Sequence, residues 1–256
     1  MRCPIDGSHA GLRAVCLEPP IYVCDDFVSA AQCSAMIAGA AASGSGLLPA
    51  SGGPEAPRTS SSMELGPEWC DELHARAARL TTQPAAHMEL PTIARYIRGQ
   101  RYIAHHDAFP AGDPLAASEN GGNRICTVLV YLNDVATGGK TTFQRAAFRG
   151  AETGLSIAPV AGRAVIFFPA DYESGVCDPL ALHEAEPAES EKWVCQLWVR
   201  QSPPGSQRTA AGRAEASARL MAADDSAHAA AEAAGARSRP PRPEPTPGNG
   251  VWRYFD

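Results

Sequence analysis

The sequence predicts an α+β, mainly β, fold in which N-terminal helices support a β core. Two observations predict it. Helical patterns occur before about residue 88, whereas β-branched and aromatic runs dominate from there to about residue 200. The helices and strands are also segregated along the chain, without the βαβ alternation of a parallel sheet. A jelly-roll or cupin-like core of antiparallel strands with helices on one side satisfies both observations.

The N-terminal half contains two candidate helices. A short strand at residues 21–24 is followed by Ser29, which is well placed to cap an Ala-rich helix that runs toward Gly39. Residues 40–57 are rich in Gly, Ser and Pro and predict a loop. A second helix is expected over residues 68–80, where Trp69, Leu73, Ala77 and Leu80 recur on one face.

The second half contains four clear strand candidates. They are residues 92–97, 125–132, 164–168 and 193–199, each bounded by Gly, Pro, Asn or Asp. Their density in Val, Ile, Phe, Tyr and Trp suits strands that are buried in a β core.

The composition predicts three regions. Residues 1–19 are expected to be a disordered lead-in, residues 20–202 a single domain, and residues 203–256 an Ala- and Pro-rich tail. The Ala-rich part of the tail favours a helix that can bury little, and the Pro-rich part favours an extended linker. Whether the tail docks on the domain is left open.

Charge and hydropathy exclude several classes of function. A formal net charge of −6 and a pI near 5.7 argue against a nucleic-acid partner. No apolar run approaches the ~20 residues of a membrane span, and no secretory signal is seen, so a cytoplasmic location is expected. Eight cysteines without any CxxC pair do not suggest a zinc site or a disulfide framework. The oligomeric state is not predicted.

Three residues form a candidate metal site. On an extended segment, His105 and Asp107 point to the same side, so both can reach one ion. His183 is the candidate for the third ligand. Two histidines and one carboxylate are the ligand set that holds non-haem Fe(II) and leaves positions open for oxygen and a co-substrate.

Further residues fit a dicarboxylate co-substrate. Lys192, nine residues beyond His183, begins an apolar strand, and a buried lysine needs an anionic partner. Thr141 offers a hydroxyl, and Tyr96 and Tyr131 offer phenols from strands expected to flank the same cavity.

Several segments resemble motifs of the prolyl 4-hydroxylase family, in family order. They are RTSS (58–61), RYIRGQRYIAHHD (95–107), GGNRICTVLVYLNDV (121–135), GGKTTF (138–143), GRAVIFF (162–168) and DPLALH (178–183). The resemblance covers about residues 20–200, and the combination is far more specific than any one motif.

This resemblance implies a 2-oxoglutarate- and Fe(II)-dependent dioxygenase on a double-stranded β-helix, which uses O2 and takes ascorbate as reductant. It implies that His105, Asp107 and His183 bind iron and that Lys192 pairs with the distal carboxylate of 2-oxoglutarate. Tyr96 and Thr141 are expected to position that co-substrate, with Tyr131 beside them. The candidates for substrate contact are Tyr102, Arg124 and Trp198.

The sequence departs from the family after the distal histidine. Glu184-Ala185-Glu186-Pro187-Ala188 replaces the usual HGGCPV, and the spacing to Lys192 is one residue shorter. The resemblance makes peptidyl proline the leading substrate, whereas the altered loop suggests free proline or another small molecule as the alternative. An inactive jelly-roll binding module is a third interpretation, although every ligand type is retained.

Overall fold

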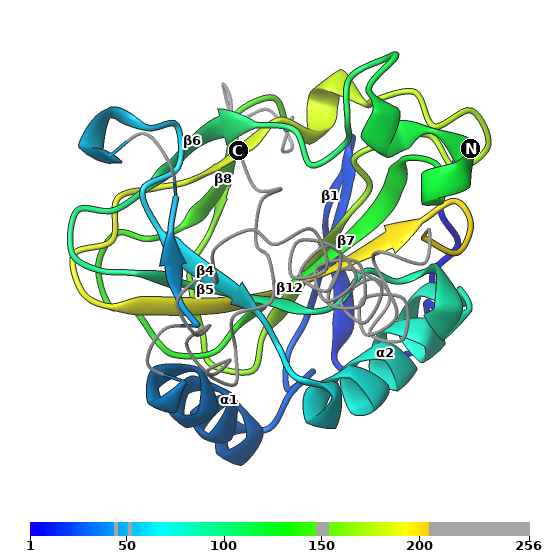
Figure 1. The fold of residues 1–256 in the computed structure, drawn as a ribbon. Helices are drawn as coiled ribbons and strands as arrows, with labels where there is room; N and C mark the ends of the chain where they lie inside the picture. The colour runs from blue at the N-terminus through cyan, green and yellow to red at the C-terminus, as the bar shows by residue number, and fades with distance from the viewer. Residues whose placement is uncertain (44–45, 51–52, 147–153, 205–256) are drawn as a thin grey trace, which may run out of the picture.

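The computed structural model describes residues 1–43, 46–50, 53–146 and 154–204, and they build two sheets and two helices (Figure 1). The larger sheet has the strand order β1 (Leu12–Leu17), β2 (Pro20–Cys24), β10 (Ala164–Phe167), β7 (Arg124–Tyr131), β12 (Lys192–Arg200), β5 (Thr92–Tyr96), β4 (Ser61–Glu64) and β3 (Leu48–Pro49). The smaller sheet has the order β6 (Tyr102–His105), β11 (His183–Ala185), β8 (Thr141–Phe143) and β9 (Leu155–Ile157). Every pairing within these sheets is antiparallel. The predicted α+β, mainly β, jelly-roll class is confirmed.

The helices α1 (Ala30–Ala42) and α2 (Pro67–Thr81) lie side by side against the outer face of the larger sheet (Figure 1). Ser29 caps α1 through a capping box with Gln32, as its position before the Ala-rich run predicts. α2 buries Leu73, Ala77 and Leu80 against the sheet, as the spacing of its apolar residues predicts. Neither helix has the length and apolar character needed to cross a bilayer, and no other helix in the described ranges does.

The central strands β7 and β12 are buried on both faces because they lie between two cores. Val128, Val130 and Leu197 pack under the helices. Leu129 and Val194 point the other way, toward the smaller sheet. Since side chains alternate along a strand, Lys192 and Trp198 share the inner face with Val194.

The prediction of a disordered lead-in over residues 1–19 is wrong for residues 12–17. They form β1, which pairs with β2, and Cys3 also reaches the core at 2% exposure. The segment orders because the free edge of β2 supplies hydrogen bonds that the local sequence does not reveal. The expected tail lies almost wholly in residues 205–256, outside the described residues.

Candidate metal centre

The smaller sheet brings the two candidate histidines together. β6 pairs with β11 so that His105 stands directly opposite His183, and their ring centroids are 4.3 Å apart. Asp107 follows two residues after His105, where β6 has ended. Its Oδ1 lies 3.7 Å from His105 Nε2, and its Oδ2 lies 3.9 Å from His183 Nε2. One ligand atom from each residue falls within 4.8 Å of the others, so the three can reach a single ion.

Backbone carbonyls fix which ring nitrogen of each histidine is available. His105 Nδ1 lies 2.8 Å from the carbonyl oxygen of Ile103, and His183 Nδ1 lies 3.0 Å from that of Ala181. A carbonyl oxygen only accepts, so each Nδ1 carries the proton and donates. The Nε2 atoms therefore present lone pairs toward Asp107, and His105 Nε2 is buried without a hydrogen-bond partner. This is the arrangement that metal-ligating histidines show.

Asp107 is held as a carboxylate although it is buried. Burial opposes its charge, but His183, His105, Arg124 and a hydrogen bond together hold the pKa of Asp107 below its ordinary value. That hydrogen bond comes from Thr127 Oγ1 on β7, which donates to Oδ2 over 2.8 Å. Burial, and then His183, lower the pKa of His105 to about 3, so its imidazole stays neutral. A buried carboxylate beside the Nε2 atoms of two histidines is a donor set that fits a divalent cation.

Lys192 and the residues expected to meet a dicarboxylate lie on the inner face of the larger sheet. The Lys192 side chain is 1% exposed, and its ammonium donates to the carbonyl oxygen of Gly139. It lies 5.2 Å from the ring centroid of Tyr96 and 5.6 Å from that of Tyr131. Tyr131 donates from its hydroxyl to Thr141 Oγ1 over 2.8 Å. Burial lowers the pKa of Lys192 to about 7 and raises that of Tyr96 to about 12.

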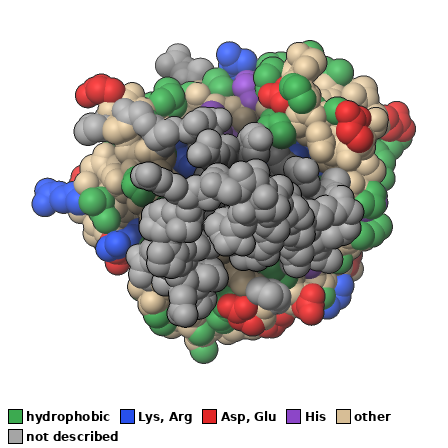
Figure 2. All heavy atoms as spheres, in the orientation of Figure 1, with side chains coloured by type: hydrophobic (Ala, Val, Ile, Leu, Met, Phe, Trp, Pro, Cys, Tyr) green, Lys and Arg blue, Asp and Glu red, His purple; other side chains and the backbone are tan. Residues whose placement is uncertain are grey.

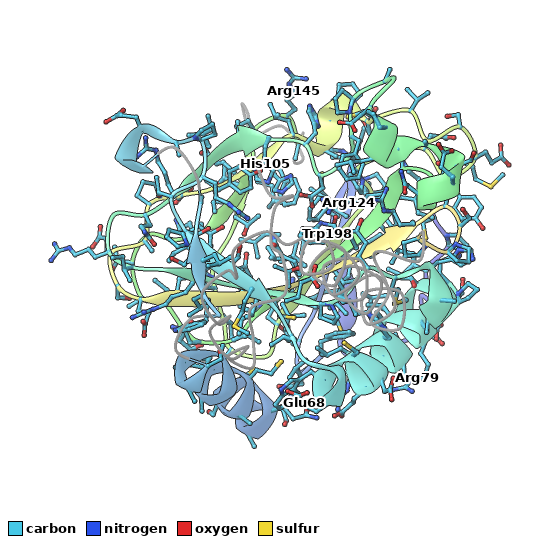
Figure 3. The ribbon with its side chains drawn as sticks, in the orientation of Figure 1. Glu68, Arg79, His105, Arg124, Arg145 and Trp198 are labelled. Atoms are coloured by element: carbon cyan, nitrogen blue, oxygen red, sulfur yellow. The ribbon has the colours of Figure 1, made fainter. Side chains whose placement is uncertain are left out.

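The three candidates for substrate contact adjoin the metal ligands. The ring of Tyr102 stacks on that of His105, with centroids 3.5 Å apart and planes 9° from parallel. Arg124 and Trp198 lie next to each other, with the guanidinium 3.8 Å from the ring centroid of Trp198 (Figure 3). Both of these side chains are buried.

Sequence reasoning missed the residues that hold Arg124. Glu89 accepts from Arg124 Nε and Nη2, both over 2.8 Å, and its Oε1 also lies 2.6 Å from Nε of the fully buried Arg200. Thr127, which orients Asp107, was missed as well. The one available signal was that Arg200 carries a charge at the end of an apolar strand run, and such a charge needs a partner.

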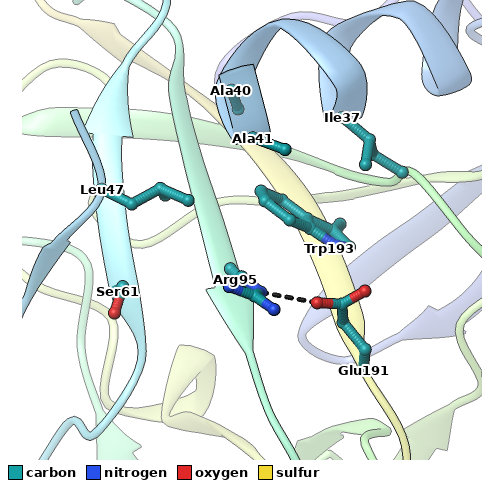
Figure 4. Close-up of a pocket in the computed structure, with 8 residues that line it drawn as sticks. All are labelled: Ile37, Ala40, Ala41, Leu47, Ser61, Arg95, Glu191 and Trp193. Atoms are coloured by element: carbon teal, nitrogen blue, oxygen red, sulfur yellow. Dashed lines mark hydrogen bonds and ion pairs between the residues drawn. The ribbon is translucent and has the colours of Figure 1, made fainter. Parts of the chain in front are cut away.

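A cavity of about 420 Å³ lies away from this centre (Figure 4). It is lined on the outer side of the larger sheet by Trp193, Arg95 and Glu191, together with residues of α1. Arg95 Nε bonds Glu191 there over 2.5 Å. Trp193 alternates with Lys192 along β12, so the cavity and the metal centre are on opposite faces of the sheet.

Several known proteins are similar to this chain. The family described as the 2OG-Fe(II) oxygenase superfamily matches residues 91–200, which include all three candidate ligands and Lys192. Prolyl 4-hydroxylase 2 of Arabidopsis thaliana is 35% identical over 122 residues, covering 42% of this chain and 40% of its own length. Prolyl 4-hydroxylase 1 of the same plant is 34% identical over 136 residues, covering 50% and 47%. The chain spans about half the length of the curated relatives it matches.

A solved structure agrees over most of the described fold. The viral collagen prolyl hydroxylase of Paramecium bursaria Chlorella virus 1, crystallised as a 2OG complex, superimposes with a TM-score of 0.57 and 25% identity. The match covers 73% of this chain and 98% of the viral one. Over residues 91–200 the chain is therefore similar to the 2OG-Fe(II) oxygenase superfamily, and the named relatives to which it is similar are prolyl 4-hydroxylases.

Proposed function

We propose that this protein is a 2-oxoglutarate- and Fe(II)-dependent dioxygenase that hydroxylates proline in a peptide. The observation that carries the proposal is the cluster of His105, Asp107 and His183, with both Nε2 lone pairs and a buried carboxylate turned toward one point. The similarity to prolyl 4-hydroxylases supports the choice of proline. When bound, Fe(II) and 2-oxoglutarate would supply oxidation by O2, in which 2-oxoglutarate becomes succinate and CO2 and the substrate gains one oxygen atom.

The protein residues would bind, orient and exclude water. His105, Asp107 and His183 would hold the metal on one side, and Thr127 would fix the direction of the carboxylate. Lys192 would exchange its contact with the Gly139 carbonyl for the distal carboxylate of 2-oxoglutarate, with the hydroxyl pair of Tyr131 and Thr141 beside it. Tyr96 would close the inner wall near the ammonium. Ascorbate is expected to act as an external reductant.

The test is the intact mass of a proline-containing peptide after incubation with the protein, Fe(II), 2-oxoglutarate and ascorbate, with succinate quantified in parallel. We expect one added oxygen for each succinate formed, and loss of both products in His183→Ala. His106→Ala is the matched control, because His106 lies next to two ligands in sequence but is not one of the three. Succinate formed with free proline but with no peptide would replace the peptide by a small molecule. Neither product in iron-loaded protein would refute the enzymatic proposal.

A further inference from the structure

The metal centre lies in a region whose charge is opposite to that of the whole chain. The described side chains in and around it include five cations, namely Arg58, Arg124, Arg145, Lys192 and Arg200. Four anions lie in the same region, namely Glu89, Asp107, Glu184 and Glu186. Since the charges of a divalent metal and a dicarboxylate cancel each other, the loaded site would keep about one positive charge. The chain as a whole carries −6.

Arg58 is one of the cations that give the region its excess of positive charge. Its backbone forms an isolated bridge to Tyr102 at the edge of β6, and its guanidinium lies 5.9 Å from the Tyr102 ring centroid. Tyr102 in turn stacks on the candidate ligand His105. Arg58 is only half-exposed, and within the described ranges it forms no ion pair with a carboxylate. A half-buried guanidinium beside the reaction centre is a binding group for an anion.

Arg145 supplies a second cation on the other side of the histidine pair. It follows β8 by two residues, at the end where Phe143 lies beside His183, and its Nη1 donates to the carbonyl of Pro179 over 3.1 Å. Figure 3 shows it beyond His105, at the opposite side from Arg124. The nearby Asp178 is already paired with Arg2. Among the described residues Arg145 has no carboxylate partner either.

The two arginines lie on either side of the ligand-bearing strands. In Figure 2, histidine atoms reach the surface on the upper part of the face, with Lys or Arg atoms and Asp or Glu atoms both nearby. The sheet order explains why the two arginines flank the centre. Arg58 stands beyond β6 and Arg145 beyond β8, while the ligand-bearing pair β6 and β11 lies between them.

We infer that the substrate is an acidic peptide, with carboxylates on both sides of the residue that is hydroxylated, and that Arg58 and Arg145 bind those carboxylates. The inference rests on the proposed function of the site. It adds a requirement for negative charge in the substrate, which the sequence motifs do not indicate. Because exposed ion pairs are screened by salt, the preference should be largest at low ionic strength.

The test compares three peptides that differ only in the residues flanking one proline, which are Glu, Gln or Lys. Hydroxylation is measured by mass, and binding is measured separately to protein loaded with Mn(II) and 2-oxoglutarate without oxygen. We expect kcat/KM about tenfold higher for the Glu peptide than for the Gln peptide, with the Lys peptide lowest, and the ratio should shrink toward one at high salt.

Two variants assign the effect to the arginines. Arg58→Gln and Arg145→Gln should each lower the Glu-to-Gln ratio about threefold to fivefold, and Arg58→Lys should restore part of it. Arg79→Gln on the distant helix α2 is the matched control and should leave the ratio unchanged (Figure 3). A ratio of one or less, or a ratio that neither variant changes, would overturn the inference. If the Glu peptide binds preferentially but is never hydroxylated, the charge inference stands and the proposed chemistry fails.

Discussion

At the residue scale, the candidate centre depends on hydrogen bonds between the three ligands and groups that are not themselves ligands. Carbonyl oxygens two residues before each histidine hold the Nδ1 protons, and Thr127 holds one oxygen of Asp107. These partners set the tautomer and the direction of each ligand before any metal binds. The ligands themselves could be predicted from the sequence, because His-x-Asp on an extended segment has a defined geometry. Thr127 could not, since a threonine inside a buried strand looks like any other β-branched residue.

The role of Thr127 gives the first prediction. Thr127→Val keeps the shape of the side chain but removes the hydroxyl, so Asp107 loses its orienting donor. We expect Mn(II) affinity, measured by titration calorimetry, to fall about tenfold. Losses of this size are typical when a residue that hydrogen-bonds to a metal ligand is removed. Thr127→Ser should retain most of the affinity. Unchanged affinity in the valine variant would show that Thr127 does not orient the carboxylate.

Lys192 gives a prediction about pH. Burial lowers its pKa to about 7 from the ordinary 10.5, so the ligand-free protein loses this charge as the pH rises through 7. A dicarboxylate needs the charged form, so binding of 2-oxoglutarate above pH 7 should take up a proton. Calorimetry at pH 8 in buffers of different ionisation enthalpy should show uptake approaching one proton, falling toward zero at pH 6.

The control for that measurement is Lys192→Met, which cannot titrate. It should bind 2-oxoglutarate more weakly and without the lysine-linked proton. If the wild type shows no uptake at pH 8, then Lys192 is already charged in the free protein, and its contact with the Gly139 carbonyl stabilises the ammonium more than burial disfavours it.

At the scale of elements, the sequence predicted the two helices and the longer strands, and it missed the short strands of the smaller sheet. α1 and α2 begin within two residues of the expected positions, because a cap and an apolar face mark them locally. The four-residue strand β6 and the three-residue strands β8, β9 and β11 carry no such pattern. They are held by pairing with distant segments, and yet β6 and β11 carry two of the three candidate ligands. The candidate site was therefore predicted from residue types and motif resemblance. The smaller sheet that brings its residues together was not predicted.

The cap of α1 allows a stability prediction. In Ser29→Ala, the helix loses the hydroxyl that accepts from the backbone N–H of Gln32. The free energy of unfolding in urea should fall by about 1 kcal/mol without a change in m-value. Ser34→Ala, within the same helix and exposed, is the control and should cost little, because alanine has the higher helix propensity. Equal effects of the two substitutions would argue against the cap.

At the scale of the whole molecule, the candidate centre joins segments that are far apart in the chain. His105 and His183 are opposite each other on β6 and β11, whereas Asp107 is tied through Thr127 to β7 of the larger sheet. A bound ion would therefore connect both sheets. The free protein has to hold two imidazoles and a carboxylate together without that ion, so metal binding and folding should be coupled.

This coupling gives the last prediction. Mn(II) at one hundred times its Kd should raise the free energy of unfolding by about 2.7 kcal/mol, provided that the unfolded chain does not bind it. His183→Ala should abolish most of this stabilisation, because a two-ligand site binds far more weakly. His106→Ala should retain it, although it removes a histidine between two ligands in sequence. A full Mn(II) response in His183→Ala, or its loss in His106→Ala, would mean that the ion is held by a different set of residues from the cluster that the two sheets bring together.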